Sequence, residues 1–340
     1  MREIKTGLVG LGYWGPNLLR VMYDLPGVDV SWICDLDEDR LARYGRRYPA
    51  TKPTTEMDDL LGDDDLDAIL IATPIFTHAE LAWRSLEAGK HTFVEKPLAP
   101  SSREADDLID LAAGRDLTLM CGQTFLYSPP VRTLKEYIDR GDLGRIFFIS
   151  SSRVNLGLHQ RDVSVIWDLA PHDFSILLYW LGEVPETVAA VGRDSIVPGI
   201  PDVVFITLRF PSGIVCNVEL SWLAPSKLRR TVVVGSEKMA VYDDVSPEPI
   251  RLFDHGVVYE DPETFGEYHL SYRTGDIVSP RIDTAEPLGT ELSDFVASIS
   301  AAEEGRHLKL SADVVRMVEA AERSLENGGA PVALVERAER

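Results

Sequence analysis

Residues 4–15 read IKTGLVGLGYWG, a short β-rich run that passes directly into three closely spaced glycines. Residues 10–15 match G-x-G-x-x-G, a pattern typical of dinucleotide-binding turns when it lies between a strand and a helix. In such a turn Gly10 permits the sharp bend, Gly12 lets the backbone approach a pyrophosphate, and Gly15 lets the helix pack close to the strand. Because the free N–H groups at the start of the helix favour a phosphate, the stretch predicts a dinucleotide site.

Asp35 extends this pattern. It follows the next β-rich run, residues 28–34, and stands twenty positions after Gly15. A carboxylate there can accept hydrogen bonds from the adenine-ribose hydroxyls, and together with Asp37 it repels a 2′-phosphate. An isolated loop aspartate needs no ligand, but the complete pattern favours a cofactor contact. The sequence therefore predicts NAD rather than NADP.

The first 120 residues alternate β-rich runs with helical segments. This alternation indicates βαβ units and a doubly wound parallel sheet of the Rossmann type. We therefore expect residues 1–122 to form an α/β dinucleotide-binding domain. The expected strands are residues 4–9, 28–34, 68–72, 92–95 and 117–121, and the expected helices are residues 15–23, 40–48, 57–61, 78–88 and 102–113.

The remainder of the chain follows a different pattern, in which strand-like runs succeed one another with short turns around one early helix, residues 171–181. Such a pattern predicts an α+β domain over residues 123–340 with a large, mainly antiparallel sheet. Residues 254–287 are polar and rich in Pro and Gly, and we interpret them as long loops. Two further helices are expected at residues 289–301 and 312–327.

The composition is that of an ordinary globular protein with an excess of acid. Of 340 residues 45% are hydrophobic, and 34 basic against 55 acidic residues give a net charge of −21. This charge repels phosphates, so nucleic acid and anionic membranes are not expected partners. The three cysteines, Cys34, Cys121 and Cys216, form no CxxC pair, and we expect neither a disulfide framework nor a metal site. With no signal peptide or membrane-spanning apolar run evident, we expect a cytoplasmic protein.

Further cofactor contacts are expected where the parallel strands end, because sheets of this class bind ligands at their carboxyl edge. His78 begins the helix after the third of these strands, and it either contacts the cofactor or faces solvent. The expected cofactor-binding residues are Gly10, Gly12, Tyr13, Trp14, Gly15, Asp35, Thr73, Pro74, His78, Glu95, Lys96 and Gln123.

Two short segments carry candidate acid–base residues. Lys96 lies at a strand end, before a proline that restricts it to extended backbone. Asp168 and His172 are four residues apart, and Pro171 fits a first helical turn, so we expect a helix that starts near Asp168 with both side chains on one face. The positive helix end then favours a neutral His172 that can accept a proton. The alternatives are a solvated lysine, a capping aspartate and a packed histidine.

Taken in order, these motifs carry a family resemblance over residue 1 to about residue 185. The order GLGYWG (10–15), Asp35, ATP (72–74), EKP (95–97) and D-x-x-x-H (168–172) resembles the glucose–fructose oxidoreductase / inositol dehydrogenase / MocA (Gfo/Idh/MocA) family of NAD(P)-dependent sugar and cyclitol oxidoreductases.

The resemblance implies that Lys96, Asp168 and His172 occupy catalytic positions and that the Lys96–Pro97 bond is cis. It also implies a homodimer or homotetramer built on the outer face of the C-terminal sheet. The segment WDLAPHD (167–173) is similar to sugar dehydrogenases of aminoglycoside or nucleotide-sugar pathways. It departs from many members in having Ala170-Pro171 where they carry glycine.

The function expected on these grounds is oxidation of a secondary ring hydroxyl of a sugar or cyclitol, with His172 as base, Lys96 stabilising charge on oxygen, and Asp168 orienting His172. The roles of Lys96 and His172 can be exchanged. The alternatives are an NAD(P)H-dependent ketosugar reductase and a non-enzymatic dinucleotide-sensing regulator. An acidic chain also suits a cationic amino sugar or aminoglycoside substrate, although a merely solvated surface explains the charge equally. The expected substrate contacts are Lys96, Arg153, Asn155, Trp167, Asp168 and His172.

Overall fold

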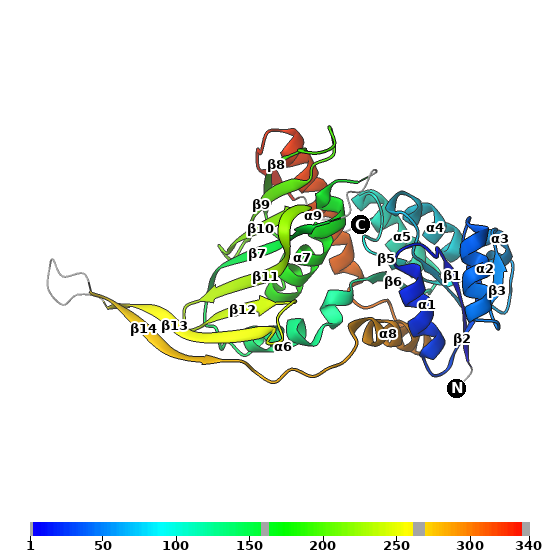
Figure 1. The fold of residues 1–340 in the computed structure, drawn as a ribbon, viewed down its shortest axis with the longest axis horizontal. Helices are drawn as coiled ribbons and strands as arrows, with labels where there is room; N and C mark the ends of the chain where they lie inside the picture. Colours follow the sequence, from blue (N-terminus) through cyan, green and yellow to red (C-terminus); the bar gives the residue numbers. More distant parts are fainter. Residues whose placement is uncertain (1–2, 158–162, 261–268, 335–340) are drawn as a thin grey trace. The chain divides into compact units, whose positions relative to one another are not determined.

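The chain folds into two compact units, shown as a ribbon in Figure 1. The computed structural model describes residues 3–157, 163–260 and 269–334. The first unit comprises residues 1–127 and 285–316, and the second comprises residues 128–284 and 317–340.

The first unit is built on a six-stranded sheet in the order β3-β2-β1-β4-β5-β6, in which all neighbours are parallel. The strand order reverses between β1 and β4, which is where sheets of this class bind ligands. All residues of β4 are buried, as expected of a parallel strand covered on both faces. The predicted Rossmann arrangement is confirmed. The strands are β1 (Ile4–Val9), β2 (Val28–Cys34), β3 (Lys52–Thr54), β4 (Ala68–Ile71), β5 (His91–Glu95) and β6 (Leu119–Gly122).

The helices between these strands begin at recognisable caps. Asp37 accepts the N–H groups of Asp39 and Arg40 at the start of α2, and Ser101 accepts the N–H of Glu104 at the start of α5. The helices that alternate with the strands are α1 (Gly15–Asp24), α2 (Glu38–Arg47), α3 (Met57–Leu61), α4 (His78–Glu87) and α5 (Ser102–Gly114), with short 3₁₀ turns η1 (Ile75–Thr77) and η2 (Thr124–Tyr127).

A helix from late in the chain completes the first unit. In α8 (Pro287–Ala301) the side chains of Glu291, Leu292 and Phe295 are fully buried, and the Phe295 ring lies edge-on to that of Phe93 in β5 at 5.6 Å. This apolar packing explains why the partition differs from the predicted division into 1–122 and 123–340. The helix α9 (Leu308–Glu326) begins in the first unit and ends in the second.

The second unit is built on a nine-stranded sheet in the order β14-β13-β12-β11-β7-β10-β9-β8-β15. Among the described strands of this sheet only the β7–β10 pair is parallel, so the predicted mainly antiparallel sheet is confirmed. Side chains alternate between a buried and an exposed face, because successive residues of a strand point to opposite sides. The strands are β7 (Ile146–Leu156), β8 (Thr187–Arg193), β9 (Val203–Arg209), β10 (Val215–Ser221), β11 (Leu223–Gly235), β12 (Met239–Asp243), β13 (Ile250–Glu260), β14 (His269–Val278) and β15 (Val332–Ala333).

The second unit has the helices α6 and α7 ahead of β8. The helix α6 (Pro129–Asp139) begins with prolines, which lose no hydrogen bond in a first turn. The helix α7 (Val165–Leu181) starts earlier than expected, so Pro171 lies inside it and not in its first turn. The prediction that α7 starts near Asp168 was therefore wrong.

The interpretation of residues 254–287 as long loops was also wrong in part. Much of this segment forms β13 and β14, which pair as an antiparallel ribbon that extends from the edge of the sheet in Figure 1. The described side chains of β14, such as Tyr272 and Ile277, are largely exposed, so the ribbon lacks the apolar alternation that marks a half-buried strand. In the described part of the chain, no helix combines the length and apolar character needed to span a membrane.

Candidate active site

The glycine turn between β1 and α1 combines two glycines required by packing with one that is not. A Cβ on Gly10 would lie 2.6 Å from the carbonyl oxygen of Ala72, and one on Gly15 would lie 1.9 Å from the carbonyl oxygen of Gly10. A Cβ on Gly12 would meet no atom within 4 Å. Folding therefore explains Gly10 and Gly15, whereas Gly12 fits a turn that must leave room for a ligand to approach its backbone.

Tyr13 and Trp14, between the second and third glycines, are both accessible, with exposed fractions of 89% and 36%. Trp14 is the residue that precedes α1, and its indole is near enough to the carboxyl of Glu95 to lower the pKa of that group. The turn is thus connected to the end of β5.

Asp35 braces the same turn from the end of β2. Its Oδ2 accepts the N–H of Leu11 at 2.6 Å, and its Oδ1 accepts the N–H of Asp37 at 2.9 Å. The guanidinium of Arg40 lies 3.5 Å from Asp35 and 3.2 Å from Asp37. The sequence did not predict that Arg40 is a neighbour of Asp35, although Asp37 and Arg40 have the spacing of a helical ion pair. Because two carboxylates face one guanidinium, the end of β2 keeps a net negative charge. This agrees with the predicted preference for a cofactor whose ribose carries no 2′-phosphate.

His78 connects two loops at the carboxyl edge of the sheet. Its side chain is buried, its Nδ1 lies 2.8 Å from the carbonyl oxygen of Pro97, and its Nε2 lies 2.9 Å from that of Thr73. Burial lowers the pKa of His78. The alternative of a solvent-facing residue was wrong. A neutral imidazole donates from one ring nitrogen only, so His78 hydrogen-bonds one of the two carbonyls and packs against the other, between the loops of Thr73 and Lys96.

Lys96 follows β5 directly, and its peptide bond to Pro97 is cis, as the resemblance implies. Its side chain is partly exposed, and its N–H donates to Oε2 of Glu95 at 3.2 Å. Glu95 is buried, as is Gln123 after β6. The sequence reasoning missed a second buried acid, Glu291 of α8, which looks in sequence like any other helical glutamate.

The second unit holds the other expected catalytic residues. Asp168 and His172 are partly exposed and lie one turn apart in α7, so the predicted shared face is retained. The predicted influence of the helix N-terminus on His172 is not retained, because His172 lies beyond the first turn of α7 and the field of a helix terminus fades within that turn.

Asp168 has a partner that the sequence did not reveal. Its Oδ2 accepts the indole N–H of Trp222 at 3.0 Å, and Trp222 is almost fully buried between β10 and β11. A Cβ on Gly157 would lie 2.9 Å from both Oδ1 of Asn155 and Cδ1 of Trp222, so these groups are tightly packed together. The end of β7 and Trp222 therefore form a rigid support for the carboxylate of Asp168.

Arg153 has a different environment from the one expected of a substrate contact. Its guanidinium forms an ion pair with Asp173 of α7, and both side chains are 5% exposed or less. Ser151 donates a further hydrogen bond to Asp173 at 2.7 Å. A buried ion pair of this kind occupies the guanidinium inside the fold, so we do not include Arg153 among the proposed substrate contacts.

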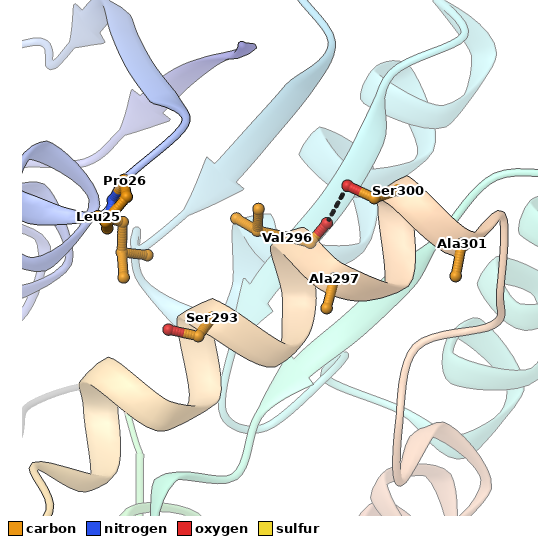
Figure 2. A pocket seen from close by; sticks show the side chains of 7 residues that line it. All are labelled: Leu25, Pro26, Ser293, Val296, Ala297, Ser300 and Ala301. Atoms are coloured by element: carbon orange, nitrogen blue, oxygen red, sulfur yellow. Dashed lines mark hydrogen bonds between the residues drawn. The ribbon is translucent and has the colours of Figure 1, made fainter. Parts of the chain in front are cut away.

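Other features of the described residues do not mark a competing site. A pocket of about 550 Å³ lies against α8, shown in Figure 2, and its lining has no titratable side chain. In that view the hydroxyl of Ser300 donates to the backbone carbonyl of Val296, so even its polar groups are engaged within the helix. Among the described residues no three His, Cys, Asp or Glu side chains are grouped so that they could hold a metal ion. The pocket is lined by Leu25, Pro26, Ser293, Val296, Ala297, Ser300 and Ala301.

Comparison with known proteins identifies relatives of this chain. Myo-inositol 2-dehydrogenase of Thermotoga maritima is 27% identical over 262 residues, covering 74% of this chain and 78% of that protein. The structure of GenD2 from gentamicin A biosynthesis, in complex with NAD, superposes with a TM-score of 0.83 at 23% identity and covers 98% of this chain and 97% of its own. That of the UDP-N-acetylglucosamine 3-dehydrogenase GnnA from Acidithiobacillus ferrooxidans gives 0.80 at 23% identity, covering 96% and 99%. These two solved structures share the fold of this chain.

Two family models match the chain in succession. The model described as the oxidoreductase family with an NAD-binding Rossmann fold matches residues 4–123, and the GFO/IDH/MocA C-terminal domain matches residues 131–241. The matches cover well over half of the sequence and include the glycine turn, Lys96, Asp168 and His172. The chain therefore belongs to the Gfo/Idh/MocA family and is an oxidoreductase with an NAD-binding Rossmann domain.

Proposed function

We propose that this protein is an NAD-dependent dehydrogenase that oxidises a secondary ring hydroxyl of a sugar or cyclitol to a ketone. The observation that carries the proposal is the position of Lys96 at the carboxyl end of β5, in the NAD-binding unit of an oxidoreductase family. A cation held there can stabilise negative charge on a substrate oxygen. The similarity to a myo-inositol 2-dehydrogenase supports a polyhydroxylated ring as the substrate.

The glycine turn supports the assignment of the cofactor. Gly12 leaves its backbone open to approach, and the carboxylates at the end of β2 suit a ribose with free hydroxyls. When NAD is bound it supplies the hydride acceptor. The proposed cofactor contacts are the residues predicted from the sequence, with His78 acting through the loops that it fixes.

In the proposed reaction His172 accepts the proton of the substrate hydroxyl, and Lys96 stabilises the charge that develops on the same oxygen. Asp168, supported by Trp222, orients His172 or holds a neighbouring hydroxyl. Asn155 and Trp167 are proposed as further substrate contacts. The roles of Lys96 and His172 can be exchanged.

The test is a panel of sugars, cyclitols and aminoglycosides incubated with NAD, read at the absorbance band of NADH, with NMR to locate the oxidised carbon. Against the substrate found, Lys96→Ala and His172→Ala should lower kcat by roughly 10²–10⁴-fold while NAD affinity stays within a few fold. Exposed Lys227→Ala and partly exposed His255→Ala serve as matched controls and should keep native kcat. Native kcat in both Lys96→Ala and His172→Ala contradicts the proposal.

Two other functions give different results in the same assays. A ketosugar reductase uses the same residues in the opposite direction and would turn over ketosugars with a preference for NADPH, which the negative corner at Asp35 and Asp37 disfavours. A dinucleotide-sensing regulator would bind NAD without turnover, and the presence of both Lys96 and His172 disfavours it.

The substrate is further proposed to carry amino groups, as an aminocyclitol or aminoglycoside does. The support is the net charge of −21, which draws cations toward the protein. In that case KM should rise with ionic strength and polyamines should compete with the substrate. A KM that does not change with salt would mean that the acidic residues form a solvated surface and do not attract the substrate.

A second copy of the chain is the proposed partner, bound through the outer face of the nine-stranded sheet. That face carries the exposed side chains of Phe148 and Val215, which are register neighbours on β7 and β10, and of Phe205 on β9. Exposed apolar side chains gathered on one face are typical of interfaces. Phe148→Asp should reduce the native mass measured by light scattering. We also propose a cytoplasmic location. The three cysteines are all free and buried, as is usual for proteins of a reducing compartment.

A further inference from the structure

Three buried oxygen atoms of the first unit have no hydrogen-bond partner among the described residues. They are the Oε1 atoms of Glu95, Gln123 and Glu291, whose side chains are 9%, 2% and 0% exposed. An acceptor that is removed from water without a donor costs free energy, so three such atoms in one region call for a source of hydrogen-bond donors.

The remaining oxygens of the two glutamates are engaged by neighbouring backbone and side chains. Oε2 of Glu95 accepts the N–H of Lys96 at 3.2 Å, and Oε2 of Glu291 accepts the hydroxyl of Thr124 at 2.8 Å. The backbone N–H of Gln123 is near enough to Glu291 to lower the pKa of its carboxyl group. The preceding residue, Gly122, is so close to Glu95 that a Cβ there would lie 3.0 Å from Oε2. Consecutive residues at the end of β6 thus contact the two carboxyl groups.

Electrostatics allows only one of these carboxyl groups to ionise near neutral pH. Burial and the charge of Glu95 raise the pKa of Glu291 well above its ordinary range, whereas burial raises the pKa of Glu95 to about 7 against the opposing effect of Lys96 and Trp14. Two like charges held close in a medium of low dielectric cannot both form without a large penalty.

The other titratable groups around the pair do not remove this penalty. Burial raises the pKa of the Cys121 thiol far above neutrality, so it adds no charge. Asp294, on the same helix as Glu291, lies 2.8 Å from Arg306 and accepts the hydroxyl of Tyr127, whose own pKa is raised. Lys96 is therefore the cation that acts on Glu95, and its partner acid must stay neutral.

We propose that Glu95 and Glu291 hold one proton between them at neutral pH, with Glu291 as the neutral acid, and that ionisation of Glu95 beside Lys96 sets the near-neutral pH dependence of turnover. A proton on Oε1 of Glu291 turns one of the three orphaned acceptors into a donor that can serve one of the other two. Glu291 acts through Glu95 and is a positioning residue. The half of the proposal that concerns turnover rests on the dehydrogenase function, and the half that concerns the proton does not.

The consequence for Lys96 follows from the sign of the charge. At pH values above the pKa of Glu95, the pair of glutamates carries one negative charge, which stabilises the ammonium of Lys96 one residue away. Below it the pair is neutral and that stabilisation is lost. If Lys96 acts as a cation on the substrate oxygen, turnover rises with pH through about 7, the pKa of Glu95.

Infrared spectroscopy of the full chain, without cofactor or substrate, tests the proton directly. At mildly alkaline pH exposed carboxyl groups are ionised, and the native protein should still show a carboxylic acid C=O band. Glu291→Gln should remove this band, and the exposed control Glu304→Gln should keep it. On acidification a second band should grow with a midpoint near about 7 and be absent from Glu95→Gln. If Glu291→Gln does not fold, the native spectrum decides, because absence of the alkaline band overturns the proposal.

The pH profile of kcat tests the assignment to turnover. The rise of kcat near neutral pH that is expected of the native protein should disappear or move by about one pH unit or more in Glu95→Gln. It should persist in Glu291→Gln, because glutamine resembles the neutral acid that Glu291 is proposed to be. An unchanged limb in Glu95→Gln assigns the ionisation to another group and overturns this half. Should no substrate be turned over at all, the dehydrogenase function fails while the infrared result still stands or falls by itself.

Discussion

The carboxylate of Asp168 is held by a hydrogen bond from the indole of Trp222, 3.0 Å from Nε1 to Oδ2. Trp222 is 1% exposed, whereas Asp168 is partly open to solvent. A rigid, buried donor therefore orients an accessible acceptor, which is the arrangement by which packing positions a group that acts on a substrate.

Trp222→Phe keeps the aromatic packing and removes the donor. We expect kcat/KM for the substrate to fall about tenfold, since one hydrogen bond to a charged group is worth about 1.5 kcal/mol, with a smaller change in melting temperature. Steady-state kinetics and thermal denaturation measure the two effects. Trp83→Phe, at a more exposed tryptophan, is the matched control and should change neither. Native kinetics in Trp222→Phe would remove Trp222 from the site.

The glycine turn gives a prediction that separates folding from binding. Gly15→Ala should destabilise the protein strongly, because its Cβ would fall 1.9 Å from a backbone oxygen, whereas the Cβ of Gly12→Ala meets no protein atom within 4 Å. We expect Gly12→Ala to keep the native unfolding midpoint and to weaken NAD binding by about tenfold, or ~1.4 kcal/mol. Urea denaturation and calorimetric titration with NAD check both. Native affinity in Gly12→Ala would show that the turn does not approach the cofactor closely.

The contacts of His78 predict a combined loss of stability and turnover. The amide of His78→Gln does not reproduce the position of the imidazole between the carbonyls of Thr73 and Pro97, where one ring N–H donates, so the free energy of unfolding should drop by about 1–3 kcal/mol. Because the loop of Lys96 is then less well fixed, kcat should fall more than NAD affinity does. The control His255→Gln alters a histidine outside this unit. If His78→Gln loses NAD affinity but keeps its stability, the histidine is a direct ligand of the cofactor instead.

Burial of Glu95 predicts an unusual dependence of stability on pH. Its pKa is about 7 in the folded chain against 4.5 for an ordinary glutamate, so between these values the folded state binds more protons than the unfolded state. The free energy of unfolding therefore falls as pH rises through this window, by roughly 3 kcal/mol from this group. Denaturant titrations at several pH values should show the slope in native protein and a weaker slope in Glu95→Gln. Equal slopes would mean that Glu95 is ionised throughout.

The sequence predicted those parts of the site whose signals are local. Gly10, Gly12, Gly15 and Asp35 stand in one short pattern with a steric meaning at each place, and Lys96 stands beside a proline that marks a strand end. The Rossmann unit and the antiparallel sheet followed from the change in hydrophobic period, which reports burial directly.

The parts that the sequence could not predict depend on tertiary packing. Glu291 and Trp222 are brought to their partners from distant segments, and a buried acid has the same letter as a solvated one. Arg153 looked like a substrate contact because its partner, Asp173, lies on a different element. The part of the ribbon beyond residue 254 was missed because the described side chains of β14, such as Tyr272 and Ile277, are largely exposed, and an exposed strand needs no alternation of apolar residues.

The packing of Phe295 against Phe93 has a consequence for protein engineering. A gene fragment that stops at residue 122 would omit α8 and leave the apolar surface of β5 facing water, along with the acid at its end. Chimeras that exchange the nucleotide-binding half between relatives must therefore transplant two separate stretches of sequence, residues 1–127 and 285–316, as one cassette. The discontinuity also means that this half cannot complete its folding on the ribosome until most of the polypeptide has been synthesised.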